Sequence, residues 1–342
     1  MISIIIPVYQ VSDYVERCIR SVISQTYTDI ECVIVDDATE DDSIDKCERL
    51  IRQYNLNENE NLDHNGRIRF KILYHEVNSG LSAARNTGTK AATGEYVFYL
   101  DGDDEITPDC IEKLVSLARK YPEAEMVIGH YCKTKENGRR KTFPEDDLPS
   151  YVASNEKIVS LYYTESLPTP AWNKLIKRSF LEEHLLYFKE GIVYEDMMWM
   201  FWCVKYLSVV AVLNEVTYHY LFRPGSITTN SDEYLVGSSF KYIYSEILTH
   251  LTRGREDKDL DRYMAGFCKW YLKCKSTIPA YQDLHHLYVE RSRQYDCWQV
   301  YLVLVTIRLV GYFGNPSVFL GWLNNLRLKW KKNHGKRLMM KG

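Results

Sequence analysis

Hydrophobic runs and amphipathic stretches alternate along the first 130 residues of the chain. Four largely apolar runs have the length and the flanking residues of buried strands, and they span residues 2–7, 30–35, 70–74 and 96–100. Between them, apolar residues recur at i, i+3, i+4 and i+7, the spacing of one helix face. Ser12 is expected to cap the first helix, and Asp41 and Asp42 to lie in the first turn of the second. This alternation predicts an α/β fold whose mostly parallel sheet is covered by helices on both faces.

The pattern changes after residue 130 and becomes helical from about residue 233 onward. We therefore expect two parts, an α/β domain at residues 1–230 and a helical C-terminal region at residues 231–342. No acid follows Asp296, whereas basic residues accumulate there among aromatic and aliphatic ones. Such a basic amphipathic tail suits the surface of an anionic membrane. The alternative is a helical extension that packs back on the first domain and ends in a basic tip.

Composition narrows the class of protein. The chain has 342 residues, of which 45% are hydrophobic and 26% charged, as in soluble globular proteins. Its net charge of −3 gives no reason to expect nucleic-acid binding. The nine cysteines form no C-x-x-C pair, and no secretory signal is recognisable, so we expect reduced thiols in a cytoplasmic protein. The tail could then contact the inner face of the cell membrane, without any membrane-spanning segment.

Three carboxylates crowd into the four residues Asp101-Gly102-Asp103-Asp104, directly after the fourth apolar run. Open α/β sheets bind their ligands at this carboxyl edge of the strands. Crowded carboxylates repel one another unless a cation or hydrogen bonds are shared among them. Because Mg²⁺ combines one or two carboxylates with phosphate oxygens, the cluster favours a metal that carries a phosphorylated substrate. The alternative is a solvated acidic turn before a helix that Thr107 caps.

The segment after the first apolar run, residues 7–12, contains no glycine. This excludes the G-x-G-x-x-G fingerprint of dinucleotide-binding proteins at that place, and the chain has no Walker A lysine motif either. A diphosphate is therefore not expected on a glycine-rich helix start. A bound metal is the natural substitute, which strengthens the interpretation of the acidic cluster.

Seven short motifs occur in a fixed order over residues 1–230: IIPVY at 5–9, IVDDATED at 34–41, NSGLSAARN at 78–86, LDGDD at 100–104, AWNKL at 171–175, YED at 194–196 and RPGSIT at 223–228. In this ordered set the chain resembles the family 2 glycosyltransferases, which are inverting enzymes with the GT-A fold. Each motif is weak alone, but the ordered set is specific. The resemblance covers about two-thirds of the chain.

The resemblance implies a binding site for a nucleotide-diphosphate sugar. The implied donor-binding residues are Pro7, Val8, Tyr9, Asp37, Asn78, Arg85 and Asp101. Tyr9 would offer an aromatic face to the base, and Asp37 would accept the imide hydrogen of uracil unless it caps the following helix. Arg85 would oppose phosphate or anchor acids. Asp101 would hold the ribose hydroxyls.

The same resemblance assigns a metal and a base. Asp103 of the D-x-D motif would ligate Mg²⁺ or Mn²⁺ on the diphosphate, with Asp104 as a secondary ligand or orienting group. Asp196 would deprotonate the acceptor hydroxyl, and Glu195 would orient a neighbour. A helix N-terminus lowers the pKa of a carboxyl group, so burial or Glu195 must offset this at Asp196.

Three further residues are candidates for the acceptor side or for secondary roles. Trp172 could stack on an acceptor sugar or pack in the core. His219 could meet the pyrophosphate or the metal, although a single histidine in an apolar run is more often a core residue. Arg223 is a candidate phosphate contact on a closing loop.

The implied activity is metal-dependent transfer of a hexosyl or N-acetylhexosaminyl group, from a UDP-sugar to a hydroxyl of a glycan or lipid-linked glycan, in polysaccharide biosynthesis. Two alternatives remain at this point. One is a non-catalytic glycan-binding or scaffolding subunit with the same fold. The other is a sugar nucleotidyltransferase, which would favour a glycine-rich, basic phosphate loop near residue 10, and the chain lacks that loop.

Overall fold

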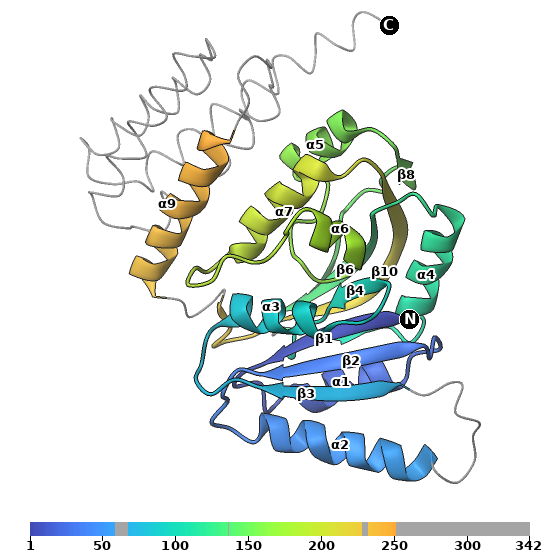
Figure 1. Ribbon diagram of the computed structural model, residues 1–342, viewed down its shortest axis with the longest axis vertical. Helices are drawn as coiled ribbons and strands as arrows, with labels where there is room; N and C mark the ends of the chain where they lie inside the picture. Colours follow the sequence, from blue (N-terminus) through green and yellow to red (C-terminus); the bar gives the residue numbers. More distant parts are fainter. Residues whose placement is uncertain (59–67, 136, 228–231, 251–342) are drawn as a thin grey trace, which may run out of the picture. The chain divides into compact units, whose positions relative to one another are not determined.

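The computed structural model describes residues 1–58, 68–135, 137–227 and 232–250 (Figure 1). Met1–Leu235 forms one compact unit, and a second unit begins at Val236. Helix α9 (Glu233–Thr249) agrees with the expected helical pattern. The predicted domain boundary between residues 230 and 231 lies outside the described residues, as does the basic tail. Both remain predictions.

Four parallel strands form the first half of the sheet, in the order β3-β2-β1-β4. Their bounds are β1 (Ile2–Val8), β2 (Ile30–Asp36), β3 (Arg69–Tyr74) and β4 (Tyr96–Tyr99). These are the four predicted apolar runs, shifted by at most two residues at either end. Ile2 is the neighbour of both Ile30 and Tyr96 across the sheet, so the carboxyl ends of the strands meet at one edge.

The sheet continues from β4 through β9, β6 and β10 to β5, with β7 paired to β6 and β8 to β10. The bounds are β5 (Glu105–Ile106), β6 (Met126–Lys135), β7 (Arg140–Phe143), β8 (Tyr151–Val152), β9 (Lys174–Lys177) and β10 (Val210–Phe222). β6 and β10 are parallel, whereas β9 runs antiparallel between β4 and β6. The α/β prediction is confirmed. Apart from the two-residue β5, the antiparallel strands follow residue 130, where the sequence pattern is irregular.

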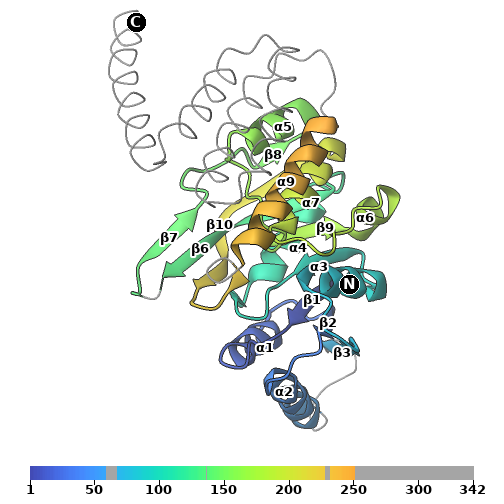
Figure 2. The same ribbon diagram turned by 90° about the vertical axis from the view of Figure 1, so that its left-hand side faces the viewer.

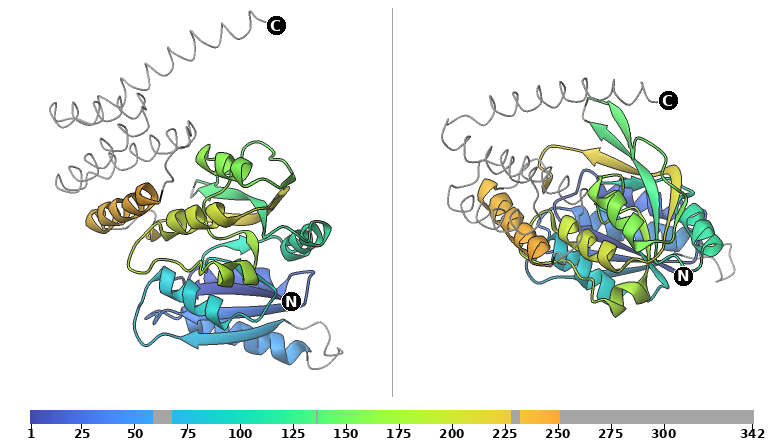
Figure 3. Two further views of the ribbon diagram at one scale, coloured as in Figure 1. Left: turned by 45° about the horizontal axis from the view of Figure 1, so that its top comes forward. Right: turned by 90° about the horizontal axis from the view of Figure 1, so that it is seen from above.

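Helices cover both faces of the sheet. Those of the first unit are α1 (Val15–Ile23), α2 (Ser43–Glu58), α3 (Leu81–Ala91), α4 (Cys110–Lys120), α5 (Asn155–Tyr163), α6 (Arg178–Glu183) and α7 (Glu195–Tyr206). α3 packs on β1 and β2, and α2 lies across the sheet from it (Figures 2 and 3). Right-handed crossovers explain this, because the chain moves one way along the sheet from β1 to β3 and returns past β1 to β4.

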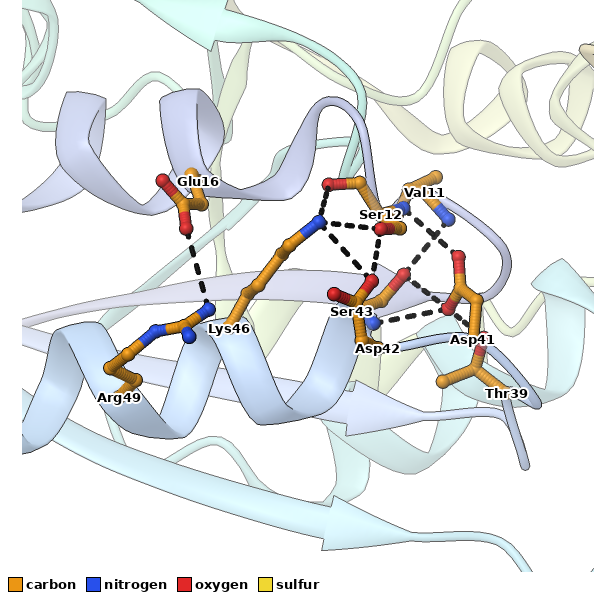
Figure 4. A network of polar contacts seen from close by, with 9 residues as sticks. All are labelled: Val11, Ser12, Glu16, Thr39, Asp41, Asp42, Ser43, Lys46 and Arg49. Carbon is orange, nitrogen blue, oxygen red and sulfur yellow. Dashed lines mark hydrogen bonds and ion pairs between the residues drawn. The ribbon is translucent and has the colours of Figure 1, made fainter.

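The positions predicted for Ser12, Asp41 and Asp42 at the starts of α1 and α2 are wrong by a few residues. α1 begins at Val15, and Ser12 does not cap it. Instead, the Ser12 hydroxyl donates to Asp42 and accepts from Lys46 Nζ at 2.6 Å (Figure 4). Asp41 precedes α2, whose first residue, Ser43, donates its hydroxyl to Asp41 Oδ1 at 2.5 Å. This network ties the loop after β1 to the loop after β2, at the edge where the site lies.

The interior contains the predicted reduced thiols. The six cysteines in the described part of the chain, Cys18, Cys32, Cys47, Cys110, Cys132 and Cys203, are free and buried. Burial raises the pKa of the Cys47 thiol to about 12, which keeps it protonated. Across the described ranges, no helix is both long enough and apolar enough to cross a membrane.

Candidate active site

The loops after β1, β2 and β4 meet at the carboxyl edge of the sheet. The Leu100 amide donates to Ile5 O at 3.0 Å, and the Asp37 amide to Val8 O at 3.0 Å. Gly102 packs so closely on this edge that an added Cβ would lie 2.9 Å from Pro7 O. The structure therefore brings the predicted base-binding residues, the Asp37 loop and the acidic cluster together.

Asp37 organises the start of α3. Its carboxylate accepts the backbone amides of Ser79 at 2.8 Å and Gly80 at 2.7 Å. His75 Nδ1 lies 2.7 Å from Asp37 Oδ1, and its Nε2 lies 2.9 Å from the Thr87 hydroxyl. The expected imide contact with uracil would have to share an oxygen with these donors. Sequence reasoning missed His75, because no motif marks it.

Tyr9 precedes Asp37 in the sequence and Asn78 follows it, and both side chains are exposed. Tyr9 keeps 39% of its surface in solvent at the end of β1, which leaves its ring open to a ligand. The Asn78 side chain accepts the Gly80 amide at 3.1 Å. Asn78 thus shapes the turn before α3, and its predicted contact with the nucleotide remains a prediction.

Arg85 joins acids from two other elements. Its guanidinium, on α3, lies 2.7 Å from Asp101 Oδ1 and 2.6 Å from Glu195 Oε1. Only 2% of Arg85 is exposed, and it lies over the Phe188 ring at 5.3 Å. Two charge-assisted hydrogen bonds in a buried setting fix the position of both carboxylates. Arg85 thus anchors acids, one of the two roles expected of it.

Asp103 pairs with the other predicted arginine. Arg223 Nε lies 2.8 Å from Asp103 Oδ2, and its guanidinium carbon lies 4.7 Å from the centre of the Tyr14 ring. Burial raises the pKa of the Asp103 carboxyl, and the neighbouring Asp101 adds to this effect. The structure thus places Arg223 at the acidic cluster, where a diphosphate would be expected.

Asp104 is 1% exposed and uses both oxygens within the protein. It accepts the Tyr218 hydroxyl at 2.7 Å and the Leu221 amide at 2.8 Å. Burial raises the pKa of its carboxyl well above the usual value, with the charge of Asp103 as the next cause. These bonds fasten the acidic loop to β10. Of the two expected roles of Asp104, the contacts support the orienting one.

Asp196 lies in the first turn of α7, beside Glu195. Tyr194, the residue before this helix, adopts left-handed backbone angles with φ 61°, a conformation that is costly for a bulky side chain. Burial and, secondly, the charge of Glu195 raise the pKa of Asp196 to about 7. Burial and Glu195 therefore raise the pKa of Asp196 against the lowering effect of the helix N-terminus, as the sequence required. A carboxyl group with this pKa can accept a proton near neutral pH.

Two residues next to Trp172 were not selected from the sequence. Asn173 has φ 57° and donates to Gly129 O and His130 O, both at 2.9 Å. Lys174 is fully buried and donates to Pro170 O. Burial lowers the pKa of Lys174 to about 7, and the charge of Asp196 opposes this shift. A buried lysine in a strand has no local sequence signal, because lysine normally indicates an exposed position.

Trp172 packs against a residue that binds the acidic cluster, whereas His219 lies away from that cluster. Trp172 is 7% exposed and stacks on Tyr218 at 4.4 Å, so its packing role dominates. His219 follows Tyr218 on β10 and therefore faces the opposite side of the strand. Its charged neighbours are Arg140 and Glu105, and burial lowers its pKa. Within the described residues, the structure does not bring His219 to the acidic cluster.

The donor set for a cation at the acidic loop is small. In the part of the chain that the structure describes, no group of three histidine, cysteine or acidic side chains could hold a metal by itself. Asp103 uses Oδ2 for Arg223, which leaves Oδ1 for another ligand. A single carboxylate fits Mg²⁺ or Mn²⁺ when substrate phosphates and water complete the shell, as is usual for Mg²⁺.

Comparison with known proteins decides the family. The profile described as "Glycosyl transferase family 2" matches residues 3–185, more than half of the chain. The chain belongs to glycosyl transferase family 2. In the fold, it is similar to TarS of S. aureus solved with UDP-GlcNAc, with a TM-score of 0.62, 17% identity and 92% of each chain covered. The predicted family and GT-A fold are thereby confirmed.

Curated relatives in this family are similar over two-thirds of the chain. The glycosyltransferase EpsJ of Bacillus subtilis is 31% identical over 67% of this chain and 63% of its own length. The glycosyltransferase GlyA of Streptococcus pneumoniae is 34% identical over 66% of this chain, but only 31% of its own length is covered. The chain thus matches less than two-thirds of the length of these relatives.

Proposed function

We propose that the protein transfers a sugar from a UDP-sugar to a hydroxyl of a glycan or lipid-linked glycan, with inversion at the anomeric carbon. The observation that carries this proposal is the pair of bonds from Arg85 to Asp101 and Glu195, since it joins the sheet edge to the α7 turn of Asp196. TarS has been solved with UDP-GlcNAc and with UDP, which supports this class of donor. Chondroitin synthase of Escherichia coli is 34% identical over 51% of this chain, which supports a glycan acceptor in polysaccharide biosynthesis.

The donor would lie across the carboxyl edge of the sheet. The Tyr9 ring would stack on the base, Asp37 would meet the uracil imide, and Asp101 would accept the ribose hydroxyls. Arg85 donates a hydrogen bond to the Asp101 carboxylate and so fixes its position. Pro7 and Val8 would form the floor of the donor site beside Gly102, which packs directly on Pro7 O and on the Val11 side chain.

Asp196 would act as the catalytic base. It takes the proton of the acceptor hydroxyl, and the oxygen then attacks the anomeric carbon from the side opposite to the leaving diphosphate. One displacement of this kind inverts the configuration. Glu195, bound to Arg85, fixes the helix turn that carries Asp196.

Asp103 would hold Mg²⁺ or Mn²⁺ through its second oxygen. A bound divalent ion neutralises the charge that develops on a departing diphosphate. A mannosyltransferase of Pyrobaculum calidifontis with 14% identity and a TM-score of 0.54 has been solved with GDP-Man and Mn²⁺, which supports a divalent metal as a cofactor of a protein with this fold. Arg223 contributes a second positive charge beside Asp103.

The enzyme would act at the inner face of the cell membrane. The basic tail, which lies outside the described residues, would hold the enzyme at the inner face of the cell membrane, next to a lipid-linked acceptor. Its excess of lysine and arginine after Asp296 supports attraction to anionic lipids.

Turnover is expected to depend on pH through Asp196. Since only the carboxylate accepts a proton, and the pKa of Asp196 is about 7, the rate of transfer should fall about tenfold per pH unit below pH 7. Initial rates at saturating donor from pH 5 to 9 give this profile. Thermal unfolding at each pH shows whether the protein stays folded. A rate that is constant from pH 8 down to pH 5 would contradict the assignment.

A metal titration tests the proposed function. UDP-sugars are incubated with the protein and Mg²⁺ or Mn²⁺, and UDP release is measured with and without a chelator. We expect chelation and Asp103→Asn each to lower the rate by about 10²-fold or more, because Lewis-acid stabilisation contributes several kcal/mol. Glu183→Gln, on the exposed surface of α6, is the control and should match the native rate. Failure of every nucleotide sugar to react would refute the proposed function.

A further inference from the structure

One face of the sheet carries aromatic rings and lysines in matched rows, on β7, β6 and β10. Tyr131 is the register partner of Phe143 on β7 and of Tyr218 on β10. Two residues on, Lys133 is the partner of Lys141 and of Tyr220. Side chains two apart on a strand share a face, so these rows lie on one side of the sheet. The three strands lie next to one another in Figure 2.

The rings of this face touch one another. We call it the aromatic–lysine face, made of Tyr131, Phe143, Trp172, Tyr218, Tyr220, Phe222, Lys133 and Lys141. Tyr131 stacks on Phe143 with centres 5.2 Å apart, and its edge meets Trp172 at 4.7 Å. Trp172 stacks on Tyr218 and also, at 5.6 Å, on Tyr220. Flat aromatic surfaces with polar edges suit sugar rings, which combine apolar C–H faces with hydroxyl groups.

The aromatic–lysine face begins at the acids of the candidate site. The Tyr218 hydroxyl donates to Asp104, and it accepts the Asp101 amide at 3.2 Å. Four residues further along the same strand, β10 ends at Phe222, which is followed by Arg223, and Arg223 pairs with Asp103. Asp196 is among the charges that act on the Tyr131 hydroxyl. A substrate whose reacting hydroxyl lies at Asp196 can therefore extend along this face.

Lys133 provides a positive charge on the aromatic–lysine face. Its side chain is partly buried, and its Nζ lies 4.3 Å from the Phe222 ring centre and 5.2 Å from that of Tyr220. Over the described ranges, no carboxylate lies within ion-pair distance of Lys133, whereas Lys141 pairs with Glu145. Lys141 is the register partner of Lys133 on β7, and a second lysine, Lys135, follows two residues on along β6. Burial and, secondly, the repulsion from Lys135 lower the pKa of Lys133. An anionic group of a ligand would relieve this repulsion.

We propose that the aromatic–lysine face binds an acceptor glycan that carries a negative charge, with Lys133 as the specificity-determining residue for that charge. The partly exposed rings of Tyr131, Phe143, Tyr220 and Phe222 contact the sugar faces, whereas Trp172 and Tyr218 are buried and support these rings from within the protein. Lys133 pairs with a carboxylate or a phosphate of the acceptor. This inference rests on the proposed function and names the acceptor class for the same transferase. Both sources of charge share the chemistry of an oxyanion, and the experiment distinguishes them.

Binding by the full-length protein tests the inference without any need for turnover. Three probes are titrated by calorimetry in the presence of UDP: an unsulfated hexasaccharide of alternating glucuronate and N-acetylhexosamine, a glycerol phosphate oligomer, and a neutral N-acetylglucosamine oligomer. We expect one anionic probe to bind more tightly than the neutral one. Lys133→Gln should weaken this binding about 10- to 100-fold, since a charge-assisted bond is lost, and leave the affinity for the neutral probe unchanged.

Two further variants sharpen the result. Lys133→Arg keeps the charge and should retain the preference for the anionic probe. Lys120→Gln is the matched control, because Lys120 also lies over a tyrosine ring, at 5.1 Å from Tyr121, but on α4. The inference is overturned if the neutral probe binds as well as both anionic ones, if none of the three binds, or if Lys133→Gln behaves like the native protein. UDP affinity and UDP-sugar turnover, measured on the same preparations, report separately on the proposed function.

Discussion

Asp196→Asn is expected to lower the turnover of sugar transfer by about 10²- to 10⁴-fold, the usual contribution of a general base. Asparagine has nearly the same shape but cannot take the proton of the acceptor hydroxyl. Donor affinity should stay close to that of the native protein, because Asp196 lies on the α7 turn and acts on the acceptor. Turnover is measured as UDP release with acceptor, and affinity as UDP binding by calorimetry.

The stability of the Asp196→Asn variant provides the control. The folded protein favours the neutral form of Asp196 well above the usual pKa of 3.8, since its pKa is about 7. Between these two values, stability should therefore decrease as pH rises, because the unfolded state releases the proton first. A neutral asparagine removes this cost, so the melting temperature at pH 8 should be equal or higher. Normal turnover in a folded variant would remove Asp196 from the mechanism.

Arg85→Met is expected to cost about 3–5 kcal/mol of unfolding free energy, because it leaves two acids unpaired beside a buried site. Asp101 and Glu195 would lose their bonds of 2.7 and 2.6 Å. Turnover should fall together with stability, since both the donor edge and the α7 turn lose their anchor. Urea unfolding followed by fluorescence gives the free energy.

Two variants separate this effect from the loss of any arginine. Arg52→Met removes a surface arginine that is 69% exposed and pairs with Glu48, so we expect a change of at most about 1 kcal/mol. Arg85→Lys keeps the charge, but an ammonium group lacks the fork that reaches two acids at once. Its stability should lie between that of the native protein and that of Arg85→Met. Equal stability of the Arg85→Met and Arg52→Met variants would show that the buried bridge contributes little.

Local pattern predicted the first half of the fold and the positions of the acids. The four parallel strands have largely apolar runs, and a parallel sheet brings their carboxyl ends to one edge, so Asp37 and Asp101 had to lie at the same edge of the sheet. The anchoring of acids by Arg85 was one of two roles expected for it. The position of Asp196 at a helix N-terminus also showed that a catalytic base there needs burial or a neighbouring acid to raise its pKa.

Long-range contacts were beyond such reasoning. The antiparallel insertion of β9 depends on register between distant segments, so the burial of Lys174 and the effect of the Asp196 charge on it could not be foreseen. Ser12 illustrates the same limit, because its side chain meets Asp42 and Lys46, about 30 residues along the chain, instead of its own helix. Asp104 belongs to a visible acidic motif, yet its partners on β10 lie more than 110 residues away.

The bridge from Arg85 to Glu195 also limits how this chain can be recombined with its relatives. An acceptor-side segment grafted from another family member replaces α7, and with it one of the two acids that pair with Arg85. If the grafted segment has no carboxylate at position 195, the buried guanidinium of Arg85 is left with one acidic partner instead of two. Crossover points for chimaeras should therefore be chosen so that positions 85, 101 and 195 are inherited from the same parent.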